Sequence, residues 1–146
     1  MGDRVLLVTR LAILACFAAS LCLPVFRAHI LDTLEWPWFY GWRVLVFGWG
    51  AFFGLQFAWA GNLIFLIPLT FPRSRWSIIS SIALALCVWM ALRIRHFGGL
   101  GSGSDDYAEF VGSGYYLWIF AMSASALLPV AMISAIECQR WSRVKH

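Results

Sequence analysis

Charged side chains are scarce in this sequence, since aspartate, glutamate, lysine and arginine together supply only 12% of its 146 residues. A soluble domain carries about 25% charged residues. Here 62% of the residues are hydrophobic and the mean hydropathy is +0.78. A chain of this composition would leave much of its apolar surface exposed in water. A soluble fold is therefore excluded, and we expect a lipid bilayer to be the solvent.

Residues that carry chemistry are also few. The three histidines, His29, His96 and His146, lie outside the long apolar runs, which excludes a haem held between helices by paired histidines. The four cysteines contain no Cys-x-x-Cys pair, so neither a thioredoxin-like motif nor a zinc knuckle is indicated. Serines in the apolar runs have no histidine or lysine there to act as a base. We expect no enzyme, no cofactor and no metal site.

The net charge of +4 does not indicate nucleic-acid binding. The basic residues are scattered between apolar runs, whereas a nucleic-acid interface gathers them on one face. They are better explained as determinants of membrane topology.

Four long apolar runs are present, and each approaches the ~20 residues that cross a bilayer. They cover residues 5–26, 44–70, 76–92 and 114–136, approximately. The second run is long for one upright crossing, and Pro129 predicts a kink in the fourth. Arg10 lies near the start of the first run, where it can extend to the headgroups. The sequence predicts an all-α fold, with residues 1–146 forming one antiparallel bundle of four transmembrane helices.

Topology follows from where the basic residues fall. If the N-terminus is inside, seven basic residues lie on the inner side: Arg4, Arg10, Arg73, Arg75, Arg140, Arg143 and Lys145. Four lie on the outer side: Arg27, Arg43, Arg93 and Arg95. Because inner loops are enriched in Lys and Arg, both termini are predicted to be cytoplasmic.

Tryptophan is abundant, and five of the nine are predicted to anchor the protein at the membrane surface. Indole suits this zone because it joins an apolar ring to a polar N–H group. These anchors are Trp36, Trp38, Trp42, Trp76 and Trp118. A surface for docking a partner is the alternative for the aromatic stretch at 36–42.

A ridge of small residues runs along the second apolar run at four-residue spacing, formed by Gly50, Gly54, Ala58 and Asn62. Small residues at this spacing let helices approach closely, and Asn62 is able to hydrogen-bond across such a contact. Gln56 is the other polar residue of this run. We expect the ridge to pack helices within the bundle, or to join the chain to another membrane protein or a second copy.

The outer loop at 97–113 is rich in glycine and serine and is predicted to be a flexible linker. Its acidic residues, Asp105, Asp106 and Glu109, either bind a cation weakly or form a solvated surface. The sequence leaves these two interpretations open.

Three motifs stand out: Gly48-Trp49-Gly50, the stretch Gln56-Phe57-Ala58-Trp59-Ala60-Gly61-Asn62, and Gly114-Tyr115-Tyr116-Leu117-Trp118, which opens the last span. Together they resemble motifs of small bacterial inner-membrane proteins without a characterised activity. The resemblance implies a four-helix protein of the bacterial inner membrane and transfers no catalytic residue.

Small size, short loops and small-residue ridges favour a protein that acts through helix contacts in the bilayer. Such a protein would protect or assist a membrane system, for example as an immunity protein against a membrane-inserting toxin. A subunit of a small channel or transporter is the alternative. A membrane redox or enzyme subunit is the least favoured class.

Overall fold

The structure is a computed structural model that describes residues 3–28, 38–47, 57–93 and 108–144, with side chains left undescribed at 28, 108–110 and 136–144. Three long helices dominate it: α1 (Asp3–Cys22), α5 (Arg75–Arg93) and α6 (Ser113–Val144). Each is long and apolar enough to cross a membrane, α6 over its Ser113–Ala135 part. They correspond to the first, third and fourth predicted spans.

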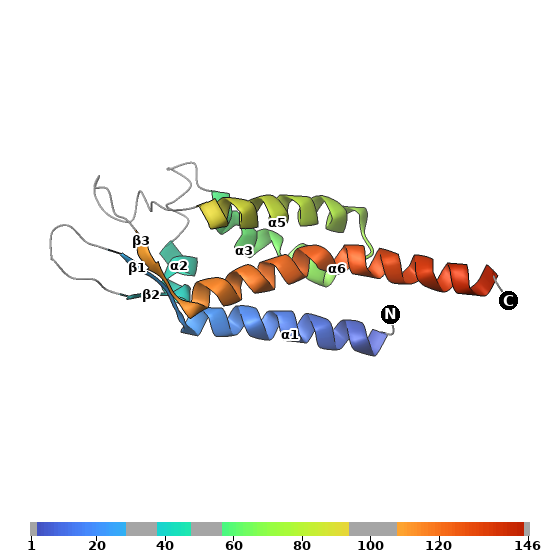
Figure 1. Cartoon of the computed structure of the whole chain (residues 1–146), viewed down its shortest axis with the longest axis horizontal. Helices are drawn as coiled ribbons and strands as arrows, with labels where there is room; N and C mark the ends of the chain where they lie inside the picture. Colours follow the sequence, from blue (N-terminus) through green and yellow to red (C-terminus); the bar gives the residue numbers. More distant parts are fainter. Residues whose placement is uncertain (1–2, 29–37, 48–56, 94–107, 145–146) are drawn as a thin grey trace.

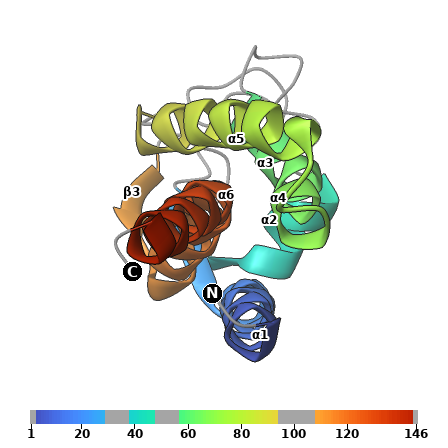
Figure 2. The ribbon, with the colours of Figure 1, turned by 90° about the vertical axis from the view of Figure 1, so that its right-hand side faces the viewer.

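The long helices lie side by side, and α6 is central (Figures 1 and 2). It contacts α1 on one side, and α5 and α4 (Leu66–Thr70) on the other. Helices α1 and α6 run in opposite directions, so both ends of the chain lie at the same end of the bundle (Figure 1). We call this the terminal end, and the opposite end the sheet end.

The second predicted span differs from a single long helix. Within residues 41–47 and 57–70, the structure has α2 (Gly41–Phe47), a short 3-10 helix η2 (Phe57–Ala60), α3 (Gly61–Ile64) and α4. The indole Nε1 of Trp59 donates a hydrogen bond to the carbonyl oxygen of Leu45 at 2.9 Å. In a continuous helix these residues would be about 21 Å apart along the axis. Leu45 and Trp59 therefore do not belong to one continuous helix, and the prediction of a single helix over 44–70 is wrong.

The fold is mostly helical, as predicted, but a small three-stranded antiparallel sheet that was not predicted lies at the sheet end (Figure 1). Its central strand is β1 (Pro24–Ala28), which lies between β2 (Trp38–Tyr40) and β3 (Ala108–Val111). Pro24 cannot continue the backbone ladder of α1, so the first span ends at Cys22 rather than near residue 26. Strand β3 lies in the predicted linker, whose residues 97–107 fall outside the described residues.

Glycines allow the sheet to join the helices closely. Gly112 N donates to the carbonyl of Val25 at 2.7 Å, and Gly41 N donates to the carbonyl of Leu23 at 3.1 Å. A methyl group on Gly112 would overlap the carbonyl oxygen of Pro24, and one on Gly41 would overlap that of Ser20. Only glycine fits at these two backbone crossings.

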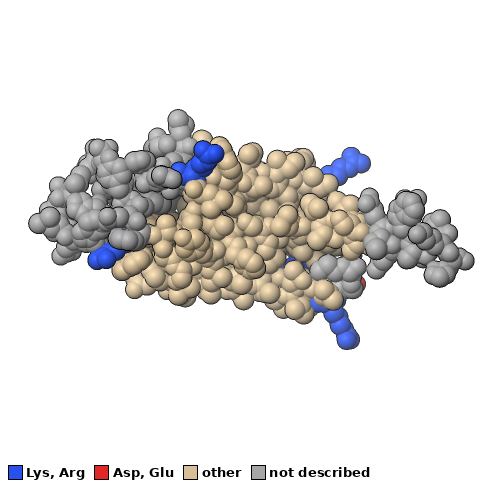
Figure 3. Space-filling view, viewed as in Figure 1, with Lys and Arg blue, Asp and Glu red and all other residues tan. Residues whose placement is uncertain are grey.

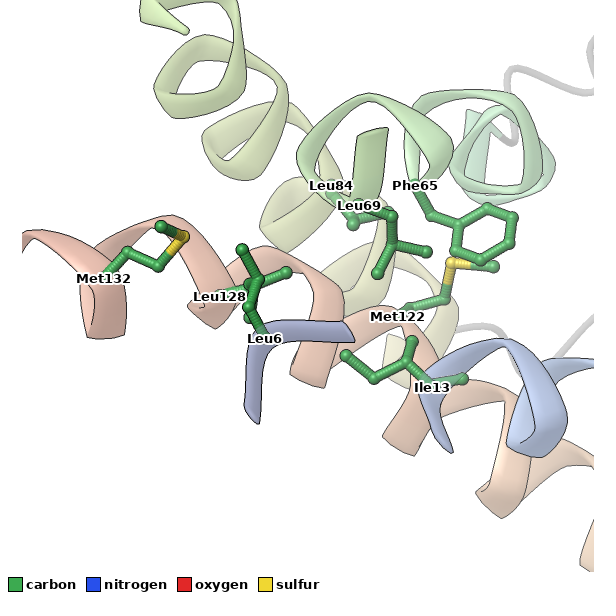
Figure 4. Close-up of a cluster of buried hydrophobic side chains, with 9 residues drawn as sticks. Leu6, Ile13, Phe65, Leu69, Leu84, Met122, Leu128 and Met132 are labelled. Atoms are coloured by element: carbon green, nitrogen blue, oxygen red, sulfur yellow. The ribbon is translucent and has the colours of Figure 1, made fainter. Parts of the chain in front are cut away.

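One apolar core joins the helices along the bundle (Figure 4). Its buried members are Leu6 and Ile13 of α1, Phe65, Leu69 of α4, Leu84 of α5, and Ala121, Met122, Leu128 and Met132 of α6. The rings of Phe17 and Phe65 lie 4.4 Å apart, so α1 also contacts the short helices. Burial of these side chains from α1, α4, α5 and α6 fixes the arrangement of the bundle.

Outside this core, the surface of the bundle is apolar. On the face shown in Figure 3, the protruding Lys and Arg side chains lie at the two ends, and a broad uncharged band separates them. Large hydrophobic side chains are exposed along this band on α1, α5 and α6. A band of this kind suits a bilayer, where apolar surface does not need to be buried.

Candidate functional site

The small-residue ridge is described in part. Gly50, Gly54 and Gln56 lie outside the described residues, whereas Ala58 and Asn62 are both buried. They belong to the short helices that pack against α5. The described part of the ridge therefore packs helices within the chain.

Asn62 bonds across the bundle. Its Oδ1 accepts a hydrogen bond of 2.7 Å from the indole Nε1 of Trp118 in α6. The two residues are 56 positions apart, and Asn62 is 8% exposed. A buried amide oxygen without a donor would cost free energy, so this bond fixes α3 against α6. Trp118, which the sequence grouped with the surface anchors, packs against the core instead.

Sequence reasoning missed a close contact between α3 and α5, which is made by Gly61. A Cβ atom at this position would lie 3.3 Å from Cys87 Cβ and 3.5 Å from Leu84 Cδ1 of α5. The Cys87 thiol donates to the carbonyl oxygen of Phe57 at 3.6 Å, beside this contact. A glycine directly before Asn62 was the available signal, but the four-residue spacing directed attention to other positions.

A second polar bond joins α6 to the break between α3 and α4. Pro68 has no N–H group, so the carbonyl of Ile64 has no donor four residues ahead, and the helix is interrupted at Phe65. The hydroxyl of Ser125 donates to the carbonyl oxygen of Phe65 at 2.8 Å. Nearer the sheet end, the hydroxyl of Tyr115 donates to the carbonyl of Ala91 in the last turn of α5 at 2.9 Å. Helix α6 therefore donates hydrogen bonds both to α5 and to the short helices from Phe57 to Thr70.

The other predicted aromatic anchors lie toward the ends of the bundle. Trp38 and Trp42 are exposed at the sheet end, and Trp76 is 71% exposed at the terminal end. Trp36 is outside the described residues. The guanidinium of Arg43 lies 5.5 Å from the Trp42 ring centroid, and Arg93 lies 5.0 Å from that of Trp89. Arginine stacked on tryptophan suits the headgroup zone, where both a cation and an aromatic ring are favoured.

Three buried polar atoms of the described residues have no hydrogen-bond partner: Arg10 Nε, Ser77 Oγ and Ser81 Oγ. Ser77 is fully buried and Ser81 is 8% exposed. All three residues lie in the half of the bundle that contains the terminal end, because both α1 and α5 begin there (Figure 1). The cross-helix bonds of Trp118 and Tyr115 lie in the other half. The three buried polar atoms without a partner thus lie nearer the termini than these two cross-helix bonds.

Arg10 lies on the packed face of α1. Leu6, Ile13 and Ser20 are buried and Phe17 packs against the core, so the face has the spacing 6, 10, 13, 17 and 20. This alternation of four and three residues is the spacing of a helix that packs against a neighbour. An arginine therefore occupies a position where an apolar residue is expected, and the only ion pair between described residues joins Asp3 to Arg73.

The acidic loop cannot be placed as a cation site. Asp105 and Asp106 lie outside the described residues, as does the side chain of Glu109. Over the described ranges there is no group of three or more His, Cys, Asp or Glu residues that could hold a metal ion.

No protein-family model, curated protein or solved structure matches this chain. Interpretation of the site therefore depends on its geometry.

Proposed function

We propose that this chain is a multi-pass accessory or protective protein, of the immunity type, which acts by helix contacts with another protein in a bacterial inner membrane. Both termini are placed in the cytoplasm by the proposal. Both termini lie at one end of the bundle, which supports their location on the same side of the membrane (Figure 1). The excess of basic residues at that end supports the cytoplasmic side.

The exposed face of α5 carries this proposal. Ile79, Ile82, Leu86 and Trp89 are each more than half exposed, and they follow one another at intervals of three, four and three residues. This spacing places bulky side chains in one stripe along the helix. Such a stripe matches the knobs with which one helix packs against another. The occupant we propose is a transmembrane helix of the partner protein.

Replacing Ile82 and Leu86 together with alanine is expected to lower recovery of the partner with the tagged chain at least fivefold. Both side chains are exposed, so their truncation removes contacts with a neighbouring helix and leaves the core intact. Recovery is measured by purification from native membranes in mild detergent, and protection is measured as survival of cells exposed to the membrane-acting agent.

The matched control replaces Leu7 and Leu11 of α1 with alanine. These residues are also four apart, and each is 56% exposed. Their replacement is expected to leave recovery and protection unchanged. Equal recovery with the α5 double variant and the wild type would contradict the proposal, as would an equal loss with both double variants. A second copy recovered as the sole partner would assign the stripe to a homo-oligomer.

A subunit of a small channel or transporter is the second candidate, and the buried hydroxyls of Ser77 and Ser81, which have no hydrogen-bond partner among the described residues, favour it. These hydroxyls would face a water path between the helices.

Replacing both Ser77 and Ser81 with alanine separates the two candidates. If these hydroxyls are enclosed in a packed bundle, their removal is expected to raise the free energy of unfolding by about 1 kcal/mol, because an unsatisfied buried polar group is lost. If they line a water path, solute flux into liposomes should fall and stability should not increase. Stability is measured by unfolding in mixed micelles. The accessory proposal expects no flux above that of empty vesicles.

A further inference from the structure

Arg10 lies at a depth where its side chain is able to reach the edge of the hydrocarbon region. Helix α1 has 20 residues and is therefore about 30 Å long, close to the thickness of a bilayer core. Arg10 follows Asp3 by seven residues, which places its Cα about 10 Å along the axis. Side chains on a helix tilt toward its N-terminus, so the guanidinium extends back toward the headgroups at the terminal end.

The guanidinium of Arg10 needs an anionic partner that the described residues do not provide. Its Nε atom is buried and has no acceptor there, although the residue is only partly buried as a whole. Asp3, the acidic residue at the start of α1, lies 3.7 Å from Arg73 Nη2 instead. A charge held at this depth without a counter-ion is costly, and such residues are commonly functional.

The surroundings indicate the kind of anion. The contact between Asp3 and Arg73 places the turn before α5 next to the start of α1, and Arg73 is exposed at this end. The guanidinium presents planar N–H donors that match two oxygens of a phosphate. The apolar side chains of Leu7 and Leu11 on α1 are exposed beside it, and acyl chains can lie against them.

We propose that Arg10 binds the phosphate of an anionic phospholipid, seated at the terminal end of the bundle with its acyl chains along α1. The site does not depend on the proposed accessory function, because it needs neither the α5 stripe nor a protein partner.

The test compares Arg10→Gln with Arg4→Gln. Each variant removes one positive charge from the same helix, but Arg4 is exposed whereas Arg10 lies on the packed face. Native mass spectrometry measures the fraction of protein that retains phosphatidylglycerol after detergent exchange. We expect Arg10→Gln to lower this fraction at least tenfold, and Arg4→Gln to remain within twofold of the wild type. Millimolar inorganic phosphate should not displace the lipid.

Unchanged lipid retention in Arg10→Gln would overturn the proposal, and so would an equal loss in the two variants, which would indicate general attraction between charges. Displacement by inorganic phosphate would assign the site to a free anion instead. If Arg10→Gln does not fold, thermal unfolding of the wild-type protein with added lipid tests the proposal instead. Phosphatidylglycerol should raise its melting temperature and phosphatidylcholine, whose headgroup is neutral overall, should not. Equal stabilisation by both lipids would contradict the site.

Discussion

Replacing Gly112 with alanine is expected to lower the free energy of unfolding by about 3 kcal/mol, the upper part of the range for overpacking. The added methyl group would overlap the carbonyl oxygen of Pro24. This neighbour is backbone, so no side chain can rotate away to make room. Either β1 or the start of α6 must move, and movement would weaken the bond from Gly112 N to Val25 O. Unfolding of the purified protein in mixed micelles measures the loss.

Gly61→Ala is the matched control for this prediction. The nearest atom to the added methyl group would be Cys87 Cβ at 3.3 Å, so α3 and α5 would need to separate by only a few tenths of an ångström. Alanine also favours a helix over glycine by about 1 kcal/mol, which offsets the closer contact. We expect the net change to be smaller than about 1 kcal/mol. Equal stability of Gly112→Ala and the wild type would show that the sheet does not approach the start of α6 this closely.

Replacing Trp118 with phenylalanine is expected to lower stability by about 1–2 kcal/mol, because Asn62 Oδ1 would keep its buried position and lose its donor. Asn62→Leu removes the unsatisfied acceptor, so the double variant should be more stable than the sum of the two losses predicts. A double-mutant cycle measures this coupling, for which we expect about 1 kcal/mol.

Trp76→Phe is the control for the general effect of replacing tryptophan with phenylalanine. Trp76 is 71% exposed on α5, so this substitution should alter stability by less than about 0.5 kcal/mol. Strictly additive losses in the cycle would show that the bond between Asn62 and Trp118 contributes nothing.

Hydropathy predicted the long helices well because each of them is a continuous apolar run in the sequence. The third predicted span, 76–92, differs by one residue at each end from α5 (Arg75–Arg93). The first was extended past Pro24 because Val25 and Phe26 are apolar, although a proline at that position marks the end of a helix. Apolar character alone does not distinguish a strand from the last turn of a helix.

The short helices and the site could not be predicted in the same way. One tertiary contact, from Trp59 to Leu45, shows that α2 and η2 are not parts of one long helix, and hydropathy does not encode this contact. Asn62 bonds across a contact between α3 and α6, but its partner lies 56 residues away in the sequence, where no spacing rule points to it. Arg10 was predicted to reach the headgroups; its place on the packed face of α1 required the structure.

The position of α6 has a consequence for the order in which the protein is completed. The short helices from Phe57 to Thr70 are about 21 Å long, less than the thickness of the hydrocarbon, and they expose Asn62 Oδ1 and the carbonyl of Phe65. The donors for both, Trp118 and Ser125, belong to α6, which a ribosome makes after the short helices. Until α6 emerges, the nascent chain carries these acceptors without their final partners, so release from the insertion machinery before that moment would leave them facing lipid.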